Sequence, residues 1–509
     1  MPFPLLEYTK TEKMMEDTIC AVSTPPGIGG IAVVRISGKD AVAIVDKVWR
    51  GRELSRAASH TAHLGEIVEE SGEVLDQAVA TVFRAPKSFT GEDVVEVSVH
   101  GSRWIQREVV NLLVRNGCRV AMPGEFTRRA YASGRMDLAE AEAVADMIAS
   151  SSRAAHRLAV SQMKGDFSRC LKELRDRLLE LASMLELELD FSEEEVEFAS
   201  REALKELAAQ IYATVSRLVE SFSTGSAIKS GIPVAIVGAT NAGKSTLLNR
   251  LVGDNRAIVS DIHGTTRDII EDIMEIDGLQ FRLVDTAGLR DTDDVVESLG
   301  IERTMEQIDR ASIVIWVVDS TSGRDEIADT WERIHGRIPE DAHLIVAWNK
   351  SDALGDGAMY APECSLHNIM TSDESSDSMS SGNGGELSSS TVTQQLSVDI
   401  RPFEGTVSEV HISAATGSGV EELCAKLTDA SGIGEWQDSI VVTNARHYEA
   451  LVHSQESVSR VIEGLSHNLS GDFIAQDIRE TIHYLGEITG EITTDDILGT
   501  IFSRFCIGK

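Results

Sequence analysis

The sequence predicts a multidomain α/β protein. We expect an α+β N-terminal domain, a helical domain, and a third domain inserted into the helical one, with a parallel-rich sheet and helices on both faces. Three observations lead to this fold class. Strand-like apolar runs precede an amphipathic helix in the first part of the chain. Alanine-rich helical periodicity then begins near residue 138, stops, and resumes after residue 433. Between the two helical parts, an apolar run leads into a glycine-rich loop and a further helix.

These boundaries divide the chain into five predicted segments. They are an N-terminal extension at 1–17, the N-terminal domain at 18–137, the first helical part at 138–228, the inserted domain at 229–432, and the second helical part at 433–509.

Length and composition agree with several folded domains. A chain of 509 residues is long enough for about three domains, and a hydrophobic content of 42% supports globular cores. We find no apolar run long enough for a membrane span, and the charged stretch at 1–17 is unlike a secretory signal. The six cysteines are scattered without a CxxC pair, which favours reduced thiols in a cytosol. The net charge of −35 argues against general affinity for nucleic acids but leaves room for a local basic face.

The N-terminal domain is predicted to hold a mostly antiparallel sheet. The expected strands are Ile19–Val22, Gly30–Ile36, Gln77–Phe83 and Val94–Val99, and the expected helix is Ser102–Asn116. Seven arginines fall between positions 103 and 135. A solvated helix face is the favoured interpretation of these arginines, and a nucleic-acid patch is the alternative.

The helical domain is predicted from apolar residues at three- and four-residue spacing. The expected helices are 138–163, 167–189, 202–222, 444–465, 472–485 and 494–505. We expect the last three to pack on the first three as a bundle, which would make the segment between them an insertion.

The inserted domain opens with a phosphate-binding loop. Gly238-Ala239-Thr240-Asn241-Ala242-Gly243-Lys244-Ser245 follows a strand-like run and precedes a helix that starts at Thr246. This context is the one that the glycine, four free positions and Gly-Lys-Ser pattern requires. Backbone N–H groups of such a loop turn toward phosphates at a helix N-terminus. We expect Lys244 to reach the β- and γ-phosphates and the Ser245 hydroxyl to ligate Mg²⁺.

Further motifs follow in the order typical of a guanine-nucleotide site. Thr266 is expected to complete the Mg²⁺ shell. In Asp285-Thr286-Ala287-Gly288, we expect Asp285 to hold Mg²⁺ through a water molecule and the Gly288 amide to face the γ-phosphate. The carboxylate of Asp352 in Asn349-Lys350-Ser351-Asp352 can accept both N–H groups of a guanine edge, which adenine does not offer. A backbone amide of Ser413-Ala414-Ala415 can meet the guanine oxygen. The predicted nucleotide is therefore GTP.

We collect the predicted GTP contacts in one set. It comprises Asn241, Ala242, Gly243, Lys244, Ser245, Thr246, Gly264, Thr265, Thr266, Asp285, Thr286, Ala287, Gly288, Asn349, Lys350, Asp352, Ser413, Ala414 and Ala415. Resemblance to a known family adds Ser260, Asp261, Ile262 and His263 to this set.

Two features of this domain depart from a simple switch GTPase. Leu289 occupies the position where many such proteins carry a glutamine that orients the attacking water, so that group must come from elsewhere. Residues 353–406 are rich in serine and poor in apolar residues, which predicts a disordered surface insertion. A spacer is the favoured interpretation of this insertion, and a regulatory segment is the alternative.

Several motifs together resemble one family, the tRNA uridine modification GTPases called MnmE or TrmE. The resemblance covers about 18–509. Besides the guanine motifs, it rests on Thr24-Pro25-Pro26-Gly27, Ser88-Phe89-Thr90-Gly91-Glu92-Asp93, Pro123-Gly124-Glu125-Phe126-Thr127 and the terminal Phe505-Cys506-Ile507-Gly508-Lys509. Related ribosome-assembly GTPases share the guanine motifs but lack the N-terminal domain and the terminal Cys-x-Gly-Lys.

The resemblance implies a cytoplasmic homodimer joined through a folate-binding-like N-terminal domain. That domain would bind 5-formyltetrahydrofolate, a one-carbon donor, through Arg35, Glu96, Arg135 and Lys509, and Cys506 would have a catalytic role. With the flavoprotein MnmG, which supplies FAD, the family adds a carboxymethylaminomethyl-type group to carbon 5 of the wobble uridine of certain tRNAs.

The resemblance also implies a potassium-dependent GTPase whose Ras-like domains are activated by pairing. Asn241 would ligate K⁺ together with Ser260, Ile262 and Thr265, and Glu297 would orient the attacking water. A cation there would neutralise charge on the transferring phosphoryl group, which is the role of the arginine finger in other GTPases.

Two other hypotheses about the function stay open at this point. A ribosome-assembly or signalling GTPase would bind RNA or protein without one-carbon chemistry. A folate-dependent aminomethyl-transfer enzyme with a regulatory GTPase would turn over without a flavoprotein. The terminal Cys-Ile-Gly-Lys and the Pro-Gly-Glu-Phe-Thr stretch favour tRNA modification over both.

Overall fold

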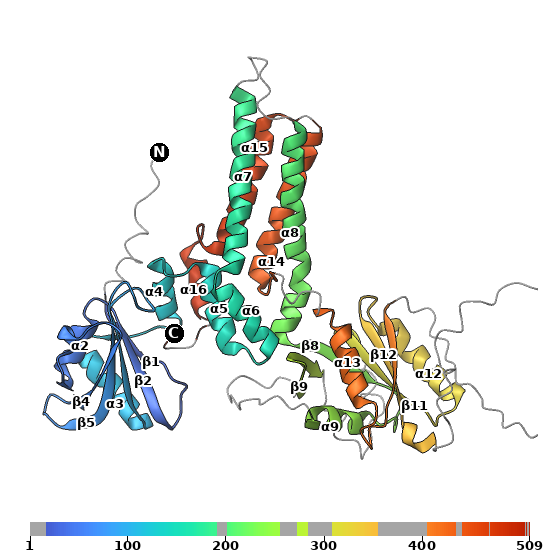
Figure 1. The fold of residues 1–509 in the computed structure, drawn as a ribbon, viewed down its shortest axis with the longest axis horizontal. Coiled ribbons are helices and arrows are strands. Elements are labelled where there is room, and N and C mark those ends of the chain that lie inside the picture. Colours follow the sequence, from blue (N-terminus) through green and yellow to red (C-terminus); the bar gives the residue numbers. More distant parts are fainter. Residues whose placement is uncertain are drawn as a thin grey trace, which may run out of the picture. The chain divides into compact units, whose positions relative to one another are not determined.

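The chain is described here from a computed structural model (Figure 1). The described residues are 17–190, 201–254, 272–283, 308–354, 405–433, 440–467, 469–503, 505 and 508. They form two compact units. Unit 1 consists of Met1–Ala149, Leu158–Glu220 and Asn444–Lys509, and unit 2 of Ser150–Arg157 and Ser221–Thr443. The five predicted domain limits stay a prediction, because these two units divide the chain differently.

The N-terminal part of unit 1 is a seven-stranded sheet with helices. Its strands are β1 (Ile19–Val22), β2 (Gly29–Ser37), β3 (Trp49–Gly51), β4 (Thr61–Val68), β5 (Val74–Phe83), β6 (Val94–Gly101) and β7 (Arg119–Val120). They lie in the order β3-β4-β5-β6-β2-β1-β7, and every pair is antiparallel except β1 with β7. The predicted antiparallel sheet and its four expected strands are confirmed. Strands β3 and β7 are too short, and β4 too polar, to stand out in the sequence.

Three helices accompany this sheet, α2 (Ala41–Lys47), α3 (Arg103–Arg115) and α4 (Glu125–Ala132). Buried aliphatic side chains of α2 and α3 share one hydrophobic core with alternate residues of β2, β5 and β6. Alternation therefore leaves the other set of strand residues off this core, among them Arg35 and Glu96. Helix α3 confirms the expected helix at 102–116.

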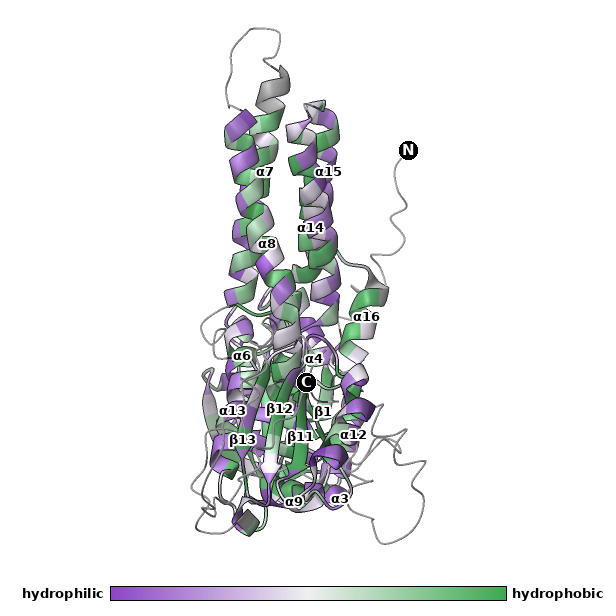
Figure 2. Ribbon diagram, turned by 90° about the vertical axis from the view of Figure 1, so that its right-hand side faces the viewer, coloured by the Kyte–Doolittle hydropathy of each residue, from purple (hydrophilic) through white to green (hydrophobic). Residues whose placement is uncertain are grey.

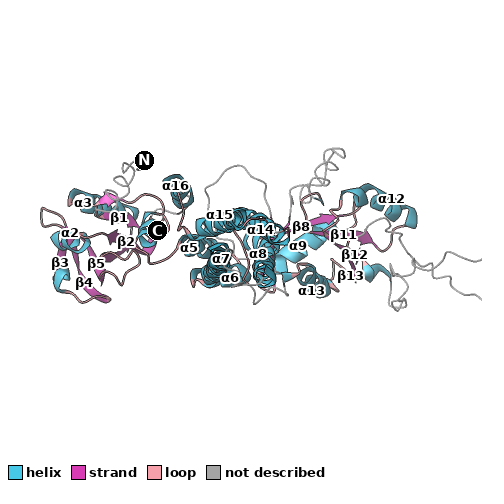
Figure 3. Ribbon diagram, turned by 90° about the horizontal axis from the view of Figure 1, so that it is seen from above, coloured by secondary structure: helices cyan, strands magenta, loops and turns pink. Residues whose placement is uncertain are grey.

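The remaining helices of the bundle are α5 (Leu138–Ala149), α6 (Arg153–Met163), α7 (Asp166–Asp190), α8 (Arg201–Ser230), α14 (Ala445–Ser466), α15 (Gly471–Thr489) and α16 (Asp495–Ser503). Helix α15 packs against α14, α7 and α5, and these helices are seen together in Figure 3. Gln455 donates from its side-chain amide to the Ser216 hydroxyl at 2.7 Å, which ties α14 to α8. The expected return of the last helices onto the first ones is confirmed, so the domain between them is an insertion.

Figure 2 shows hydrophilic and hydrophobic residues alternating along α7, α8, α14 and α15, as expected of amphipathic helices in a bundle. One expectation for the bundle is wrong. The stretch 138–163 is two helices rather than one, because the chain breaks between α5 and α6. The Ser152 hydroxyl accepts a hydrogen bond from the Ala155 amide at 3.2 Å, so a serine that looked like part of a continuous helix instead caps α6.

Unit 2 contains a six-stranded, mostly parallel sheet. Its strands are β8 (Ile232–Val237), β9 (Asp272–Ile276), β10 (Leu279–Leu283), β11 (Ile313–Asp319), β12 (His343–Asn349) and β13 (Val407–His411). The order is β13-β12-β11-β8-β10-β9, and only the β9–β10 pair is antiparallel. The parallel strands β8, β11 and β12 are buried along nearly their whole length, as strands covered on both faces are. The predicted parallel-rich sheet is confirmed.

Helices α9 (Lys244–Asp254), α12 (Arg324–Ile334) and α13 (Val420–Ala430) accompany this sheet, with α12 and α13 on opposite sides of it in Figure 3. Trp316 of β11 stacks on Trp331 of α12 with ring centroids 5.2 Å apart. This aromatic pair belongs to the core under α12. The loops that follow β8, β11, β12 and β13 meet at the carboxyl edge of the sheet, which is where open α/β folds bind ligands.

The serine-rich insertion lies almost wholly outside the described residues, which end at Leu354 and begin again at Gly405. Among the helices that the structure describes, none combines the length and the apolar character that crossing a membrane requires.

Candidate nucleotide-binding site

The phosphate loop runs between β8 and α9, as predicted. Two of its glycines adopt positive φ, 148° at Gly238 and 98° at Gly243. A Cβ added to Gly238 would lie 2.2 Å from the Val317 carbonyl oxygen, and one added to Gly243 would lie 2.2 Å from Asn349 Nδ2. Glycine is therefore required at both positions, and the loop packs closely against the ends of β11 and β12.

Lys244, the first residue of α9, folds back over this loop. Its Nζ donates to the carbonyl oxygens of Gly238 at 2.9 Å and Ala239 at 2.7 Å. Burial lowers the pKa of the Lys244 ammonium, since a desolvated charge is less stable. The N-terminus of α9 adds backbone N–H groups and the positive end of a helix dipole. The loop thus presents a positive cradle of the kind that holds phosphate groups.

Asn349, at the end of β12, joins two motifs that lie far apart in the sequence. Its side chain is buried, donates from Nδ2 to the Ala242 carbonyl at 2.7 Å, and accepts from the Ala414 amide at Oδ1 at 2.9 Å. The phosphate loop and the Ser413–Ala415 loop are therefore held together by one side chain. This arrangement brings together two predicted parts of a nucleotide site, the phosphate loop and the loop expected to meet the base.

One lysine and two aspartates complete this edge of the sheet. Lys350 has a φ of 62°, and its Nζ donates to Asp319 Oδ2 at 2.6 Å. Burial acts to raise the pKa of Asp319, but hydrogen bonds from Lys350 and Thr321 outweigh it, so the pKa is lowered. Asp352 is exposed in the short helix Ser351–Leu354. Sequence reasoning missed Asp319, whose only signal was its place at the end of the apolar run of β11.

The described part of the site contains Asn241, Ala242, Gly243, Lys244, Ser245, Thr246, Asn349, Lys350, Asp352, Ser413, Ala414 and Ala415. The predictions for Ser260, Asp261, Ile262, His263, Gly264, Thr265, Thr266, Asp285, Thr286, Ala287, Gly288, Glu297, Cys506 and Lys509 fall outside the described residues.

A second cluster lies on the sheet of the N-terminal domain. Arg35 of β2 and Glu96 of β6 are cross-strand neighbours, and Arg35 Nε donates to Glu96 Oε1 at 2.8 Å. The Arg35 guanidinium lies over the Phe89 ring at 5.2 Å and the Phe126 ring at 5.6 Å, measured to the ring centroids. The pair is half-buried, so it combines a fixed cation and an anion with two aromatic faces.

Two other chain segments reach the neighbourhood of this cluster. Arg135 is exposed, and a Cβ added to Gly91 would lie 3.3 Å from its Cγ, so it borders the loop that carries Phe89. The Gly508 carbonyl accepts from the Ser23 hydroxyl at 3.0 Å, which fixes the C-terminal segment at the end of β1. A Cβ at Gly508 would lie 2.3 Å from the Val22 carbonyl oxygen, which explains why a glycine stands there. Strand β1 pairs with β2, the strand that carries Arg35.

The interpretation of the arginines at 103–135 as a solvated face is wrong for two of them. Arg129 is almost fully buried, and it pairs with Asp17, Glu92 and Glu125. Arg119 is half-buried and pairs with Asp17 and Glu125. These ion pairs tie α4 to the start of β1 and to the Phe89 loop. Sequence alone could not separate them from exposed arginines such as Arg103.

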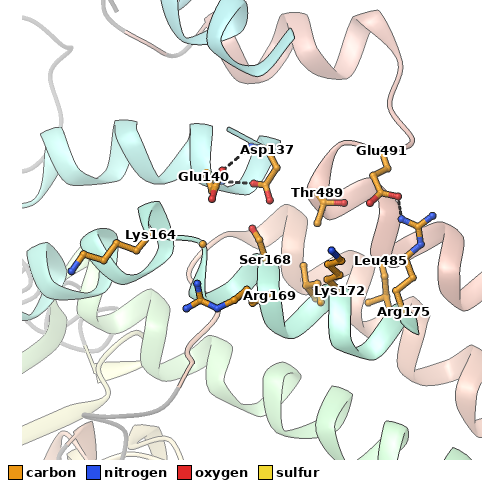
Figure 4. Close-up of a pocket in the computed structure, with 12 residues that line it drawn as sticks. Asp137, Glu140, Lys164, Ser168, Arg169, Lys172, Arg175, Leu485, Thr489 and Glu491 are labelled. Atoms are coloured by element: carbon orange, nitrogen blue, oxygen red, sulfur yellow. Dashed lines mark hydrogen bonds and ion pairs between the residues drawn. The ribbon is translucent and has the colours of Figure 1, made fainter. Parts of the chain in front are cut away.

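A pocket of about 280 Å³ lies elsewhere, among α5, α7 and α15 (Figure 4). Its acidic wall is a reciprocal helix cap, in which the Asp137 amide donates to Glu140 Oε2 at 2.9 Å and the Glu140 amide donates to Asp137 Oδ1 at 2.8 Å. Arg175 pairs with Glu491 on the opposite side. None of the predicted site residues lines this pocket, and its acids already stabilise α5.

Comparisons with known proteins agree with this architecture. Residues 138–506 match a family profile described as the MnmE helical domain, and residues 18–135 match one described as the N-terminus of the GTP-binding protein TrmE. A tRNA modification GTPase MnmE from Parabacteroides distasonis is 48% identical over 97% of this chain and 100% of its own length. Proteins with the same description from Bacteroides thetaiotaomicron and Christiangramia forsetii are each 47% identical, again over 97% of this chain and 100% of theirs.

Solved structures give a weaker likeness. A GTP-binding protein from Sulfolobus solfataricus in complex with GDP is 19% identical with a TM-score of 0.25, and the match covers 51% of this chain and 67% of that one. This likeness is too weak to bear on function. The two family profiles and the nearly full-length relatives, together with the phosphate loop and the base-binding loop joined by Asn349, show that this chain belongs to the MnmE (TrmE) family of tRNA modification GTPases.

Proposed function

We propose that this tRNA modification GTPase hydrolyses GTP at the carboxyl edge of the unit 2 sheet, and that the hydrolysis serves the addition of a carboxymethylaminomethyl group to carbon 5 of a wobble uridine. The observation that carries this proposal is the position of Asn349. Its hydrogen bonds to Ala242 and Ala414 hold the phosphate cradle and the base-binding loop in fixed register. Asp352 belongs to the same motif as Asn349. Its carboxylate would select guanine by accepting hydrogen bonds from the N–H groups of the base.

The residues present fit a nucleotide with its metal ion. Lys244 and the N-terminus of α9 would meet the β- and γ-phosphates, and the Ser245 hydroxyl and Thr266 would ligate Mg²⁺. The Lys244 ammonium donates to the carbonyls of Gly238 and Ala239, which positions it over the loop. Binding exchanges these neutral acceptors for charged phosphate oxygens, which form stronger hydrogen bonds.

We further propose a monovalent cation site that involves Asn241, Ser260, Ile262 and Thr265. Support comes from Asn241, which is exposed on the phosphate loop and has a φ of 63°, a conformation that asparagine tolerates better than most residues. Its side-chain carbonyl is a hard oxygen ligand. A potassium ion held there would supply positive charge beside the transferring phosphoryl group, where other GTPases use arginine. Many GTPases orient the attacking water with a glutamine, but this chain has Leu289 at that position. Glu297 would orient the water here.

The N-terminal domain is proposed to bind 5-formyltetrahydrofolate. The Arg35 guanidinium, the Glu96 carboxylate and the rings of Phe89 and Phe126 supply a charged and aromatic surface suited to a flat heterocycle. Arg135 is proposed as a further contact. Gly508, fixed to Ser23, supports a role for Lys509, the next residue, in the same folate site and for Cys506, two positions earlier, in the chemistry.

A homodimer joined through the N-terminal domains is proposed as the assembled form. Ile28, Ile31 and Leu64 are 83%, 68% and 66% exposed, and all three belong to the N-terminal domain. Burial against a second copy of the domain would remove them from water. The flavoprotein MnmG with its FAD, and tRNA, are proposed as the other partners, and the cytoplasm as the location.

The rate of GTP hydrolysis in K⁺ and in Na⁺ tests this proposal. Wild-type protein should turn over much faster in K⁺. Glu297→Ala should lose nearly all turnover while still binding GTP, and Asp293→Ala, which removes an acid four positions away, should stay active. Equal rates in both salts would remove the proposed cation site, and a fully active Glu297→Ala would leave the attacking water to another group.

A further inference from the structure

Helix α9 and the Ser413–Ala415 loop are joined by a second side chain that belongs to no nucleotide motif. Arg250 lies on α9, two turns after Lys244. Its Nη2 donates to the Ala415 carbonyl at 2.7 Å, and its Nε donates to the Ala414 carbonyl at 3.3 Å. A Cβ added to Gly417 would lie 3.0 Å from Arg250 Nη1, so the absence of a side chain there gives the guanidinium room to approach the loop.

The Ala414 carbonyl belongs to the same peptide plane as the Ala415 N–H. In a trans peptide these two groups point in opposite directions, so a cation that holds the carbonyl also fixes the direction of the N–H. The Ala414 N–H already donates to Asn349. Within the described part of the chain, the Ala415 N–H makes no hydrogen bond. The Ala415 N–H is therefore available to donate a hydrogen bond to a ligand.

We propose that Arg250 is a positioning residue for guanine recognition: it orients the Ala414–Ala415 peptide so that the Ala415 N–H donates to the oxygen at carbon 6 of the base. This inference rests on the proposed binding of GTP. It adds Arg250 as the residue that sets the preference for a base with an oxygen at carbon 6. A positive charge on the carbonyl also polarises the peptide, which strengthens its N–H as a donor. Asn349 fixes the loop from the strand side, and Arg250 fixes it from the helix side.

Nucleoside diphosphates test this role, because they measure binding without hydrolysis. GDP and inosine diphosphate both carry the oxygen at carbon 6, whereas 6-thio-GDP carries a sulfur, a weaker acceptor, in its place. Arg250→Ala should weaken GDP and inosine diphosphate about tenfold each, the value of one hydrogen bond, and leave 6-thio-GDP nearly unchanged. The preference for GDP over inosine diphosphate should stay constant, because Asp352 is untouched. Arg250→Lys, which can reach one carbonyl rather than two, should give an intermediate loss.

Asn249→Ala is the matched control, since Asn249 is the exposed neighbour of Arg250 on α9. It should bind all three diphosphates as the wild type does. Equal losses for all three ligands in Arg250→Ala and Arg250→Lys would overturn the inference, because they would indicate a general disturbance of the loop. Wild-type affinities in both variants would overturn it as well. If the wild-type chain itself bound no GDP, the proposed function would fail, a result distinct from either of these.

In steady-state hydrolysis the same variants should raise KM for GTP and leave kcat within about twofold, because the lost contact is to the base rather than to the reacting phosphate. If Arg250→Ala is too unstable to purify, Arg250→Lys carries the test through its ratio of GDP to 6-thio-GDP affinity. An unchanged ratio in that variant, with a normal thermal unfolding temperature, would overturn the inference.

Discussion

Glu142 Oε2 lies 2.6 Å from His447 Nε2, and both side chains are buried in the helical bundle. The two residues stand on α5 and α14, one before and one after the inserted domain. Arg446 Nη2 donates to the same carboxylate at 2.9 Å and to the Ile488 carbonyl at 3.1 Å. The Glu142 carboxylate thus joins α5 to α14, and Arg446 extends the connection to α15.

Acid should destabilise the bundle through Glu142. Burial alone would raise the pKa of Glu142, but hydrogen bonds from His447 and Arg446 outweigh it and lower the pKa to about 2. A carboxyl group with a lowered pKa contributes stability above its unfolded pKa, near 4.5, and this contribution is lost as the pH falls toward 2. Glu142→Gln should cost about 3 kcal/mol at neutral pH, because it leaves the Arg446 guanidinium and the buried His447 ring without their charged acceptor.

Urea denaturation of the two proteins between pH 5 and 2.5 measures this effect, with the pH limits set by about 2 and 4.5 as the folded and unfolded pKa values. Unfolding free energies of wild type and variant should converge as the pH falls. Glu449→Gln, an exposed acid on α14, should leave the wild-type profile unchanged. Parallel profiles for wild type and Glu142→Gln would contradict the prediction.

Asn349→Ala should weaken nucleotide binding more than any exposed substitution near the site. It leaves the Ala242 carbonyl and the Ala414 amide, both buried, without their partner, which costs about 2–3 kcal/mol, or roughly 100-fold in affinity. Titration calorimetry with GDP measures the change. A loss of less than threefold would mean that the two loops keep their register without this side chain.

Adding a methyl group at two glycines, one in the phosphate loop and one on α9, should have opposite effects on GDP binding and stability. Gly243→Ala places its Cβ against Asn349 Nδ2 and requires a positive φ, so it should abolish GDP binding. Gly253→Ala adds the same methyl group to α9, where nothing lies within 4 Å of the new Cβ. It should leave binding intact and raise stability by about 0.5–1 kcal/mol. Thermal unfolding with and without GDP distinguishes the two, and retained binding in Gly243→Ala would refute the packing explanation.

Arg35→Ala should abolish the binding of 5-formyltetrahydrofolate while GDP binding stays normal. The variant removes the cation that lies over the Phe89 and Phe126 rings and leaves the Glu96 carboxylate without its Arg35 partner. Arg35→Lys should retain only part of the affinity, since an ammonium group stacks less well between two rings. Arg103→Ala, an exposed arginine on α3, is the control. Equilibrium dialysis with the folate measures each, and normal binding by Arg35→Ala would place the folate elsewhere.

Much of the fold could be predicted because its signals are local. The buried runs of β8, β11 and β12 and the amphipathic pattern of α7 and α14 are each contained in a short stretch of sequence. The break between α5 and α6 was missed, because Ser152 caps a helix only once the chain has turned. The state of Arg119 and Arg129 was missed for a similar reason. Their partners Asp17 and Glu92 lie up to 112 positions away, and nothing in the sequence pairs them.

The sequence by itself determined the family, the guanine-nucleotide motifs and the order of helices and strands, because each depends on residues that are close together along the chain. Only the tertiary structure decided which of these residues act together. Asn349 meets Ala242 across 107 positions, Arg250 meets Ala415 across 165, and Ser23 meets Gly508 across 485. Hydrogen bonds require approach within about 3 Å, and for groups so far apart only the packing of strands and helices provides it.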